Sequence, residues 1–528
     1  MAESATYCLE NGDLSETSGF GQVRAGRASN KALMRLAGAL ERWRLHLAAA
    51  VALMLVLAVA AVGGADAKQV AQRLEAEERA AEQADGQESS SSGIPLDDLQ
   101  VATGDGAATA GGAGSTGALK GTAGAAQAGG RRGTYDPGAS DTEVRIGGST
   151  FTSGPAAVYG EQIAVGFAAG VNYVNERGGI NGRRVVLKIY DDGGDPAKQL
   201  ANTKRLVEID KVFALAMSYA PIAGEYVAEK GIPVYHLGQF NEEFTNPWWF
   251  PVGWPQRIAS YQMANYGAKE LGVKKVAVFY LDAGVVNYSK AYADKVKADW
   301  EAYGVEVPAM YGFAPDQTSC SDAISTARDA GADFIDFEID AAKTINCGVE
   351  SQLQGYKPSK GWGGYLIGVP VIHEALGDYS IGMYAFDAFG ANYDVPGYKE
   401  AVRKVSSKTE SYSSVTASYF ISALLMRDSI SKLGDNITRT RLRDTLNTFT
   451  NWQPGLTNDP NQPSWTFRPN CHLGLTGGYV IQIQKGGDGK LKWTQIFPGP
   501  NRMYDAILLP PGQGPPPEFA ACGLFRRS

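Results

Sequence analysis

The stretch GGINGRRVVLKIYDDGGDPAKQLANTKRLVE, residues 178–208, decides the interpretation of the fold. It starts with a glycine-rich turn, continues as the apolar segment 184–190 and then reaches two aspartates. An Asp-Pro pair leads into the Ala/Lys-rich segment 196–209. We expect a strand at 184–190 followed by a helix at 196–209, because short apolar runs between turn residues favour strands and Ala/Lys-rich segments favour helices.

The same alternation extends in both directions from this stretch. Strands are predicted at 144–151, 212–217, 232–237, 275–281, 307–313, 333–339 and 364–368, and helices at 160–177, 221–230, 258–271, 289–303, 321–330, 344–354, 415–433 and 439–449. A terminal β-hairpin is expected at 478–497. The pattern predicts an α/β protein with two similar blocks of mostly parallel sheet, about 141–255 and 257–384. In such sheets ligands bind beyond the carboxyl ends of the strands.

The N-terminal region contains a segment suited to a membrane. Residues 45–65 carry no formal charge, and about 20 apolar residues are needed to cross a bilayer. Arg35, Arg42 and Arg44 precede the segment. The positive-inside rule then predicts a cytoplasmic leader at 1–44, a single transmembrane helix, and a folded domain outside the cell.

A cleavable signal peptide is the alternative interpretation. It would start at Met34 and be cleaved after Ala67, which would release a secreted protein. In either case residues 66–140 are predicted to form a short solvated helix followed by a flexible Gly/Ala/Ser-rich linker. Residues 501–528, rich in proline and glycine, are predicted to be an irregular tail.

Composition and motifs exclude several functional classes. The chain has 49 Lys+Arg against 56 Asp+Glu, a net charge of −7, so a basic surface for nucleic acid is not expected. Four histidines without metal-ligand spacing and five cysteines without a Cys-x-x-Cys pair indicate no metal site and no cofactor. Asp191 and Asp192 are interpreted as a structural turn rather than as a cation site. No catalytic motif is present, so we predict that the protein is not an enzyme.

The cysteines agree with an extracellular folded domain. Cys8 lies before the apolar segment, and the other four lie after it, an even number that permits disulfides. We expect Cys320 to pair with Cys347, since each precedes a helix-like segment at neighbouring strand ends. A bond between Cys471 and Cys522 is a weaker possibility, and buried thiols are the alternative.

Residues 178–208, together with FTSGPAAVYG at 151–160, GIP at 231–233 and the pair Tyr288-Ser289, resemble the pattern of type I periplasmic binding proteins of the leucine/isoleucine/valine-binding family. The resemblance covers about residues 141–500. It implies two Rossmann-like lobes joined by three crossovers, with a central cleft. Lobe I would comprise 141–256 and 386–455, and lobe II would comprise 257–385 and 456–500.

The resemblance also implies a function. The family captures a small molecule, such as an amino acid or amide, by closing the lobes outside the membrane. The expected partners are the permease and ATPase of an ABC importer. An extracellular sensor that uses the same fold, tethered to the membrane and signalling through a partner, is the alternative.

One candidate site loop can be argued from its own residues. Ser218 and Tyr219 lie between the strand 212–217 and a helix that begins at Pro221. A helix N-terminus offers unpaired N–H groups and a positive dipole end, which suit a ligand carboxylate. The resemblance places a ligand-binding serine in this loop, whereas a plain helix cap is the alternative role for Ser218.

The remaining site residues come from the resemblance, and these are Ser153, Tyr159, Gln239 and Phe240 from lobe I and Tyr288 and Asp340 from lobe II. The two tyrosines would cover the ligand. Asp340 stands where the family often carries an aromatic residue, and its acid would pair with a ligand amine unless it is a solvated loop acid or a helix cap. Gln239 and Phe240 replace the small residues of amino-acid binders. Val369-Pro370 stands where those binders carry an acid, so no specificity for branched-chain amino acids is assigned.

Overall fold

A computed structural model describes residues 133–527, except 155–156, 217–220, 239–240, 254, 284–287, 366, 388–396, 407–412, 455–463, 470, 476–477, 498–506 and 524. The predicted leader, the apolar segment 45–65 and most of the predicted linker lie outside the described residues. Within the described part of the chain, no helix combines the length and the apolar character needed to span a membrane. The transmembrane helix at 45–65 therefore stays a prediction.

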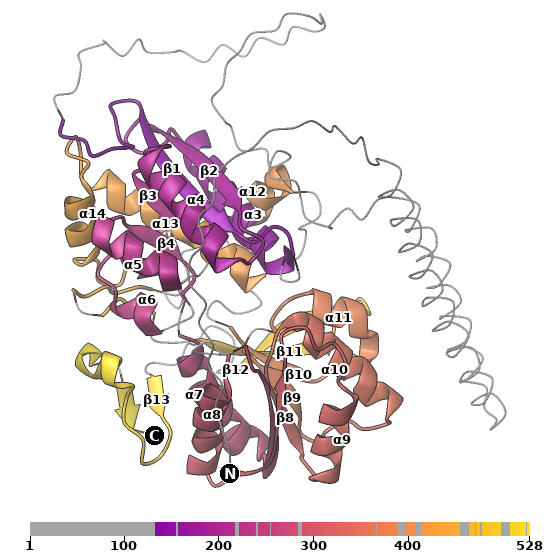
Figure 1. Cartoon of the computed structure of the whole chain (residues 1–528). Coiled ribbons are helices and arrows are strands. Elements are labelled where there is room, and N and C mark those ends of the chain that lie inside the picture. Colours follow the sequence, from indigo (N-terminus) through magenta and orange to yellow (C-terminus); the bar gives the residue numbers. More distant parts are fainter. Residues whose placement is uncertain are drawn as a thin grey trace, which may run out of the picture. The chain divides into compact units, whose positions relative to one another are not determined.

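Lobe I is built on a five-stranded parallel sheet with the strand order β2-β1-β3-β4-β5 (Figure 1). Its strands are β1 (Glu143–Thr150), β2 (Arg184–Asp191), β3 (Ala214–Ala216), β4 (Val234–His236) and β5 (Trp249–Pro251). β3, β4 and β5 are buried throughout, as expected of a parallel sheet that is covered on both faces. The parallel sheet is confirmed, and β5 is an addition that the sequence pattern did not predict.

The helices of lobe I come from two distant parts of the chain. They are α3 (Ala157–Glu176), α4 (Pro196–Glu208), α5 (Pro221–Lys230) and α6 (Asn241–Thr245), and then α12 (Tyr398–Val405), α13 (Ser414–Ser431) and α14 (Arg439–Leu446), which follow lobe II in sequence. α3 and α13 pack so closely that only glycine fits at two positions of α3. A β-carbon on Gly166 would overlap the carbonyl oxygen of Thr416, and one on Gly170 would overlap Ala423. The core of lobe I is therefore completed only after lobe II has been synthesised.

Lobe II repeats the same strand order in a larger sheet, β12-β11-β10-β9-β8-β6-β7. Its strands are β6 (Lys275–Leu281), β7 (Glu306–Phe313), β8 (Phe334–Glu338), β9 (Gly361–Gly364), β10 (Met383–Asp387), β11 (Tyr479–Lys485) and β12 (Leu491–Phe497). The first five are parallel, and in both lobes the first strand lies between the second and the third. β11 and β12 are antiparallel and form the predicted hairpin. Two similar α/β blocks are thus confirmed.

The helical elements of lobe II are α7 (Gln256–Tyr266), the π-helical turn η2 (Gly267–Leu271), α8 (Lys290–Ala302), α9 (Ser321–Asp329), α10 (Ala341–Leu353), α11 (Val371–Leu376) and the 3-10 helix η3 (Gly377–Ser380). The predicted helix at 258–271 is therefore an α-helix that ends in a π-helical turn. Every residue of α7 is buried, including polar ones, so this helix lies in the interior. Its polar side chains need partners inside the protein.

The fourth strand of lobe II is displaced from its predicted position. The prediction placed a strand at 364–368, whereas β9 ends at Gly364. A β-carbon on Gly364 would overlap the carbonyl oxygen of Phe337 in β8, so glycine is required for the strands to approach. Glycine-rich strands lack the β-branched pattern on which strand prediction depends. As a result, Tyr365 belongs to the loop at the carboxyl end of β9.

The third crossover also differs from the predicted boundary at 455/456. Trp465 donates its indole N–H to the carbonyl of Val252 at 2.9 Å. The ring of His472 stacks on Phe250 with 4.5 Å between ring centroids. Both partners belong to the β5 region, so residues 465–472 pack on lobe I, although the predicted boundary assigns them to lobe II. Buried Trp and His rings need hydrogen-bond partners, and these rings find them on lobe I.

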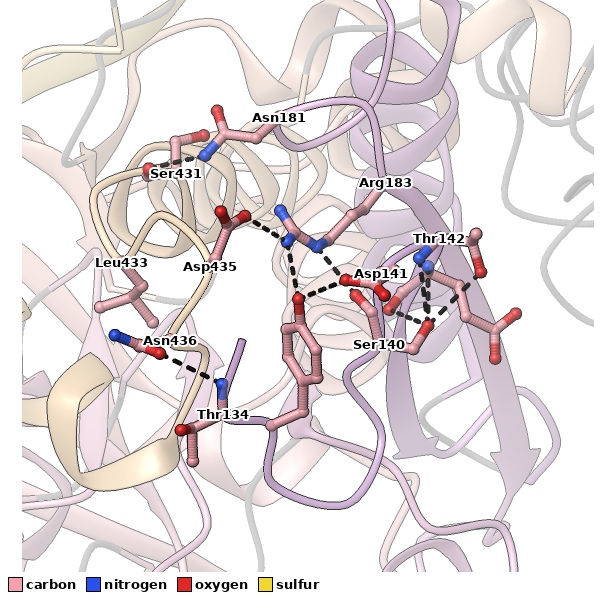
Figure 2. A network of polar contacts seen from close by, with 12 residues as sticks. Thr134, Ser140, Asp141, Thr142, Asn181, Arg183, Ser431, Leu433, Asp435 and Asn436 are labelled. Atoms are coloured by element: carbon pink, nitrogen blue, oxygen red, sulfur yellow. Dashed lines mark hydrogen bonds and ion pairs between the residues drawn. The ribbon is translucent and has the colours of Figure 1, made fainter. Parts of the chain in front are cut away.

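Residues 133–140, predicted to be linker, are folded against lobe I (Figure 2). The buried guanidinium of Arg183 donates to the carbonyl of Ser140 at 2.8 Å and to the hydroxyl of Tyr135 at 3.3 Å. It also pairs with Asp435 at 2.9 Å. A buried charge requires such partners, and residues 133–140 supply two of them. Composition alone could not show this, since Arg183 lies outside the linker.

Two disulfides are present among the described residues. Cys320–Cys347 connects the residue before α9 with α10 inside lobe II, which confirms the predicted pair. Cys471–Cys522, the weaker possibility, is formed as well. It fixes the C-terminal segment to residues 465–472, which pack on lobe I.

The predicted irregular tail at 501–528 is folded where it is described. It contains β13 (Ile507–Leu509), the 3-10 helix η4 (Pro517–Cys522) and β14 (Phe525–Arg527), and β13 pairs in parallel with β14. Phe519 is fully buried. The high proline and glycine content led to the prediction of an irregular tail, but a few apolar residues are sufficient to attach the segment to the core.

Candidate functional site

The predicted site loops follow the carboxyl ends of the strands at the point where the strand order reverses. In lobe I this point lies between β1 and β3, and in lobe II between β6 and β8. Ligands bind at such switch points in parallel sheets. Ser218, Tyr219, Gln239 and Phe240 belong to loops outside the described residues, so their predicted roles stay predictions.

Tyr159 joins the two lobes. It lies on α3 in lobe I, and its hydroxyl accepts a hydrogen bond from the backbone N–H of Ala341 at 3.1 Å. Ala341 is the first residue of α10 in lobe II. Burial raises the pKa of Tyr159, and nearby Asp340 and Tyr288 raise it further. The hydroxyl is therefore neutral at physiological pH, and three of the predicted site residues lie close together.

Asp340 caps α10. Its carboxylate accepts a hydrogen bond from the N–H of Lys343 at 2.9 Å and pairs with the ammonium of the same residue at 3.3 Å. The ammonium of Lys343 also donates to the carbonyl of Pro315 at 2.9 Å. The helix-cap role that the sequence left open is thus observed. A ligand amine at this position would share the carboxylate with Lys343.

Ser153 is held by the end of β2. Its N–H and its hydroxyl donate to the two carboxylate oxygens of Asp191, at 3.1 and 2.6 Å. Asp192 accepts the hydroxyl of Ser149 at 2.8 Å. These contacts support the interpretation of the two aspartates as a structural turn, and no group of metal-ligating side chains occurs among the described residues. The turn positions the loop of Ser153 at the carboxyl end of β1.

A second group of side chains around Tyr365 was not predicted. Burial raises the pKa of Tyr365, and the neighbouring Tyr288, Glu243 and Asp387 raise it further. Glu243 lies on α6 in lobe I, whereas Tyr365 and Asp387 lie at strand ends of lobe II. Glu243 and Asp387 are both buried. Side chains of both lobes therefore influence Tyr365 electrostatically, and Tyr288 influences both Tyr365 and Tyr159.

The sequence contained part of the signal for this second group. Asp387 ends β10, a strand that was not predicted, and Tyr365 was assigned to the interior of a strand. Tyr419 of α13 extends the group on the side of lobe I, since burial and the neighbouring Glu243 raise its pKa, although a contact with Leu237 lowers it. If the ends of β9 and β10 had been predicted correctly, Tyr365 and Asp387 would have been recognised as residues at strand ends and therefore as candidates for the site. Tyr419 could be found only from the tertiary structure.

This region contains buried carboxyl groups beside a buried histidine. His236, at the end of β4, lies 3.8 Å from Glu243, but burial lowers the pKa of the histidine to about 3. The imidazole is therefore neutral at physiological pH and does not balance the carboxylate. Glu338, at the end of β8, accepts hydrogen bonds from Gln256 at 2.7 Å and Ser260 at 2.9 Å. Burial raises its pKa to about 7.

Two α/β lobes share one order of parallel strands and are in contact at Tyr159 and Ala341, which is the architecture of a type I periplasmic-binding fold. The sequence profile described as "Periplasmic binding protein" matches residues 143–488. The chain therefore belongs to the periplasmic binding protein family, and within it to the leucine/isoleucine/valine-binding type. The family binds solutes and is not enzymatic, in agreement with the prediction that this chain is not an enzyme.

Curated relatives support this assignment. The Leu/Ile/Val-binding protein homolog 8 of Brucella abortus is 27% identical over 292 residues, which is 50% of this chain and 70% of that protein. The Leu/Ile/Val-binding protein homolog 3 of Brucella melitensis is 26% identical over 201 residues, which is 37% of this chain and 54% of that protein. For that second relative the chain spans about half the length of the protein it matches.

Solved structures share the fold. A fatty acid ABC transporter substrate-binding protein from Thermomonospora curvata superposes with a TM-score of 0.58 at 18% identity, covering 68% of this chain and 94% of that one. A leucine-binding protein from Thermotoga maritima gives a TM-score of 0.56 at 16% identity, covering 67% and 99%. A Rhodopseudomonas palustris solute-binding protein in complex with 4-hydroxybenzoate gives 0.56 at 20% identity, covering 67% and 96%. These three proteins are associated with different ligands, so the fold alone does not specify one.

Proposed function

We propose that this protein captures a small solute between its two lobes outside the cytoplasmic membrane and delivers it to the permease and ATPase of an ABC importer. The observation that carries the proposal is the contact between Tyr159 of lobe I and the N-terminus of α10 in lobe II. Tyr288 and Asp340 lie beside this contact. A ligand held there would touch both lobes, and only such a ligand shifts the population toward the closed state.

The chemistry of the region favours a ligand that carries an amine or amide. Glu243 and Asp387 lie near Tyr365, and His236 is neutral, so a hydrogen-bond donor or a cation on the ligand is complemented. The predicted loop of Ser218 would supply N–H donors for a carboxylate at the start of α5. An amino acid or an amide contains a group that suits this region. We therefore propose that class of ligand, without a preference for branched side chains.

A thermal-shift screen of the full chain tests the proposal. The panel contains amino acids, amides, short acids, sugars, 4-hydroxybenzoate and a fatty acid. A ligand present at 100 times its Kd stabilises the folded state by about 2.7 kcal/mol, which raises the melting temperature measurably. We expect the largest shift from an amino acid or an amide. Stabilisation by sugars alone would contradict the proposed ligand class.

Calorimetry with the best compound of that screen then tests the site. Asp340→Asn preserves a helix cap but removes the charge, so we expect at least roughly tenfold weaker binding, equivalent to about 1.4 kcal/mol. Asp195→Asn is the matched control, because Asp195 caps α4 in the same way, accepting from the N–H groups of Ala197 and Lys198. Equal affinities of the two variants would remove Asp340 from the site.

We further propose that residues 45–65 tether the folded domain to the outer face of the membrane. The support is the uncharged segment with arginines on its N-terminal side. Membrane fractionation of the full chain, with N-terminal sequencing of the mature protein, tests this. Cleavage after Ala67 would give a mature protein that begins with Lys68. That N-terminus would establish secretion instead of tethering.

A further inference from the structure

The C-terminal segment lies beyond the region that the family profile matches, which ends at residue 488. Its described elements, β13, η4 and β14, follow the last strand of the lobe II sheet. Phe519 of η4 stacks on Phe525 of β14, with 6.3 Å between ring centroids. The segment therefore has an internal structure of its own: β13 and β14 pair with each other, and β13 and η4 contact different lobes.

One end of the segment is attached to lobe II. β13 packs against α7, and Leu509 is buried. The carbonyl of Leu509 accepts the hydroxyl of Tyr303, which follows α8, at 3.5 Å. Gln513 donates its side-chain amide to the carbonyl of Ala298 in α8 at 3.2 Å. Figure 1 shows β13 next to α7 and α8.

The other end is attached to lobe I. Phe519 is fully buried and meets Phe244 of α6 edge to face, with 6.3 Å between ring centroids. Cys522 forms the disulfide with Cys471, and its carbonyl accepts the guanidinium of Arg468 at 2.7 Å. The neighbouring His472 is hydrogen-bonded to the carbonyl of Trp249 in β5 at 2.5 Å, so the disulfide connects η4 to residues that are bonded to the lobe I sheet.

Between the two attachments lies a stiff connection. Pro515, Pro516 and Pro517 separate Gln513 from Phe519. Pro516 has φ −49° and ψ 137°, close to the polyproline II conformation. Proline-rich segments of this kind are semi-rigid spacers of about 3.1 Å per residue. A second route joins the same two attachments, because β14 follows Cys522 directly and pairs with β13.

We propose that residues 509–522 form an interlobe strap that limits how far the two lobes separate. The main chain already passes between the lobes at three crossovers, and the strap is a further link that the Cys471–Cys522 bond closes covalently. Opening the lobes must either detach Leu509 from lobe II or displace Phe519 from lobe I. The strap thus restricts the open state, in addition to the hinge. It acts on lobe motion, whichever ligand is bound.

Interlobe distances in the full chain test the strap. Spin labels on unnatural amino acids at exposed positions 198 and 316, beside the ends of the edge strands β2 and β7, report the separation of the lobes by double electron–electron resonance. In Cys471→Ser/Cys522→Ser we expect a broader distribution that is shifted to longer distances by roughly 5–10 Å, the length of two or three extended residues. Cys320→Ser/Cys347→Ser removes a disulfide within lobe II and serves as the matched control.

A second variant keeps the disulfide and removes the buried ring that attaches η4 to lobe I. In Phe519→Ala the edge-to-face contact with Phe244 is lost, and we expect the same broadening to a smaller extent. This variant decides the question if the cysteine variant fails to fold. A wild-type distance distribution in a folded strap variant, or equal broadening in the control, would overturn the proposal. Because the measurement requires no ligand, either result leaves the proposed solute binding to be judged by its own experiment.

Discussion

The two lobes share a strand order but differ in what fills their interiors. Lobe I is completed by α12–α14 from beyond lobe II, and α13 is buried from Val415 to Met426. Lobe II buries several carboxyl groups, namely Asp299, which pairs with Arg257 at 2.7 Å, Asp336 and Glu338, whereas lobe I buries the histidines His236 and His472. Burial disfavours the charged form, so it raises the pKa of a carboxyl group and lowers that of a histidine. Although the two lobes share a topology, we therefore expect their stabilities to respond differently to mutation and to pH.

The largest expected effect concerns the helix contact of lobe I. Gly166→Ala places a β-carbon against the carbonyl oxygen of Thr416, which is backbone and cannot rotate away. We expect a loss of about 3 kcal/mol in the free energy of unfolding, the upper range for overpacking. Urea denaturation monitored by circular dichroism measures it.

The control for this variant lies in lobe II. Gly487→Ala, in the turn of the β11–β12 hairpin, places a β-carbon where no atom lies within 4 Å. We expect a change within about 0.5 kcal/mol. If both variants had similar stabilities, the close packing of α3 on α13 would not be what completes lobe I.

The next prediction concerns the pH response of lobe II. Burial raises the pKa of Glu338 from 4.5 to about 7 in the folded state. Between these values the folded protein holds a proton that the unfolded chain has lost, so the contribution of Glu338 to stability is fully present below pH 4.5 and is lost as the pH rises to about 7. Glu338→Gln should remove this slope, a difference on the order of 1–3 kcal/mol across the window. Chemical denaturation at several pH values measures it.

An exposed glutamate on α8 provides the control. Glu301→Gln should leave the pH dependence unchanged, since Glu301 is exposed at the surface. An unchanged slope in Glu338→Gln would mean that Glu338 is charged in the folded protein at a pH of about 5–6, between its unfolded and folded pKa values. The neighbouring Asp336 would then be the group that carries the proton.

Lobe I should respond to pH in the opposite direction. Burial lowers the pKa of His472 from 6.5 to about 4, although contacts with Trp249 and Asn246 raise it. Below pH 6.5 the unfolded chain binds a proton that the folded protein does not, so stability is lost as the pH falls from 6.5 to about 4. His472→Gln should reduce this loss by about 1–2 kcal/mol, measured as the slope of stability against pH. His373→Gln, at a half-buried position in lobe II, should retain most of the slope.

The elements of the fold were largely predictable, and the packing was not. Strands such as 184–190 and helices such as 415–433 contain local apolar patterns that survive in the structure. β9 was misplaced because glycine, required for close approach to β8, carries no strand signal. The attachment of residues 133–140 and the burial of Arg183 depend on partners up to 303 residues away in sequence, which no local pattern contains.

The candidate site likewise contains residues that the sequence predicted and residues that it did not. Tyr159 and Tyr288 were assigned by resemblance and Asp340 by its charge at the end of a predicted strand, and in the structure Asp340 and Tyr288 both influence the pKa of Tyr159. Tyr365, Asp387 and Glu243 were missed, because Tyr365 and Asp387 are located by strand ends that the sequence did not define and Glu243 by a helix of five residues. Prediction of a site in this fold therefore depends on where each strand ends.

The smallest expected effect tests the contact between the lobes. Tyr159→Phe removes the hydroxyl that accepts the N–H of Ala341, and one such hydrogen bond contributes about 1 kcal/mol. We expect longer distances between labels at positions 198 and 316. Tyr356→Phe is the matched control, since it removes a bond of 2.7 Å to the carbonyl of Ala332 within lobe II. The control should lose a similar amount of stability without a change in distance. If Tyr159→Phe also left the distances unchanged, the hydroxyl would stabilise α10 and not the relative position of the lobes. The role of Tyr159 as a ligand-covering residue would then have to be tested by binding measurements alone.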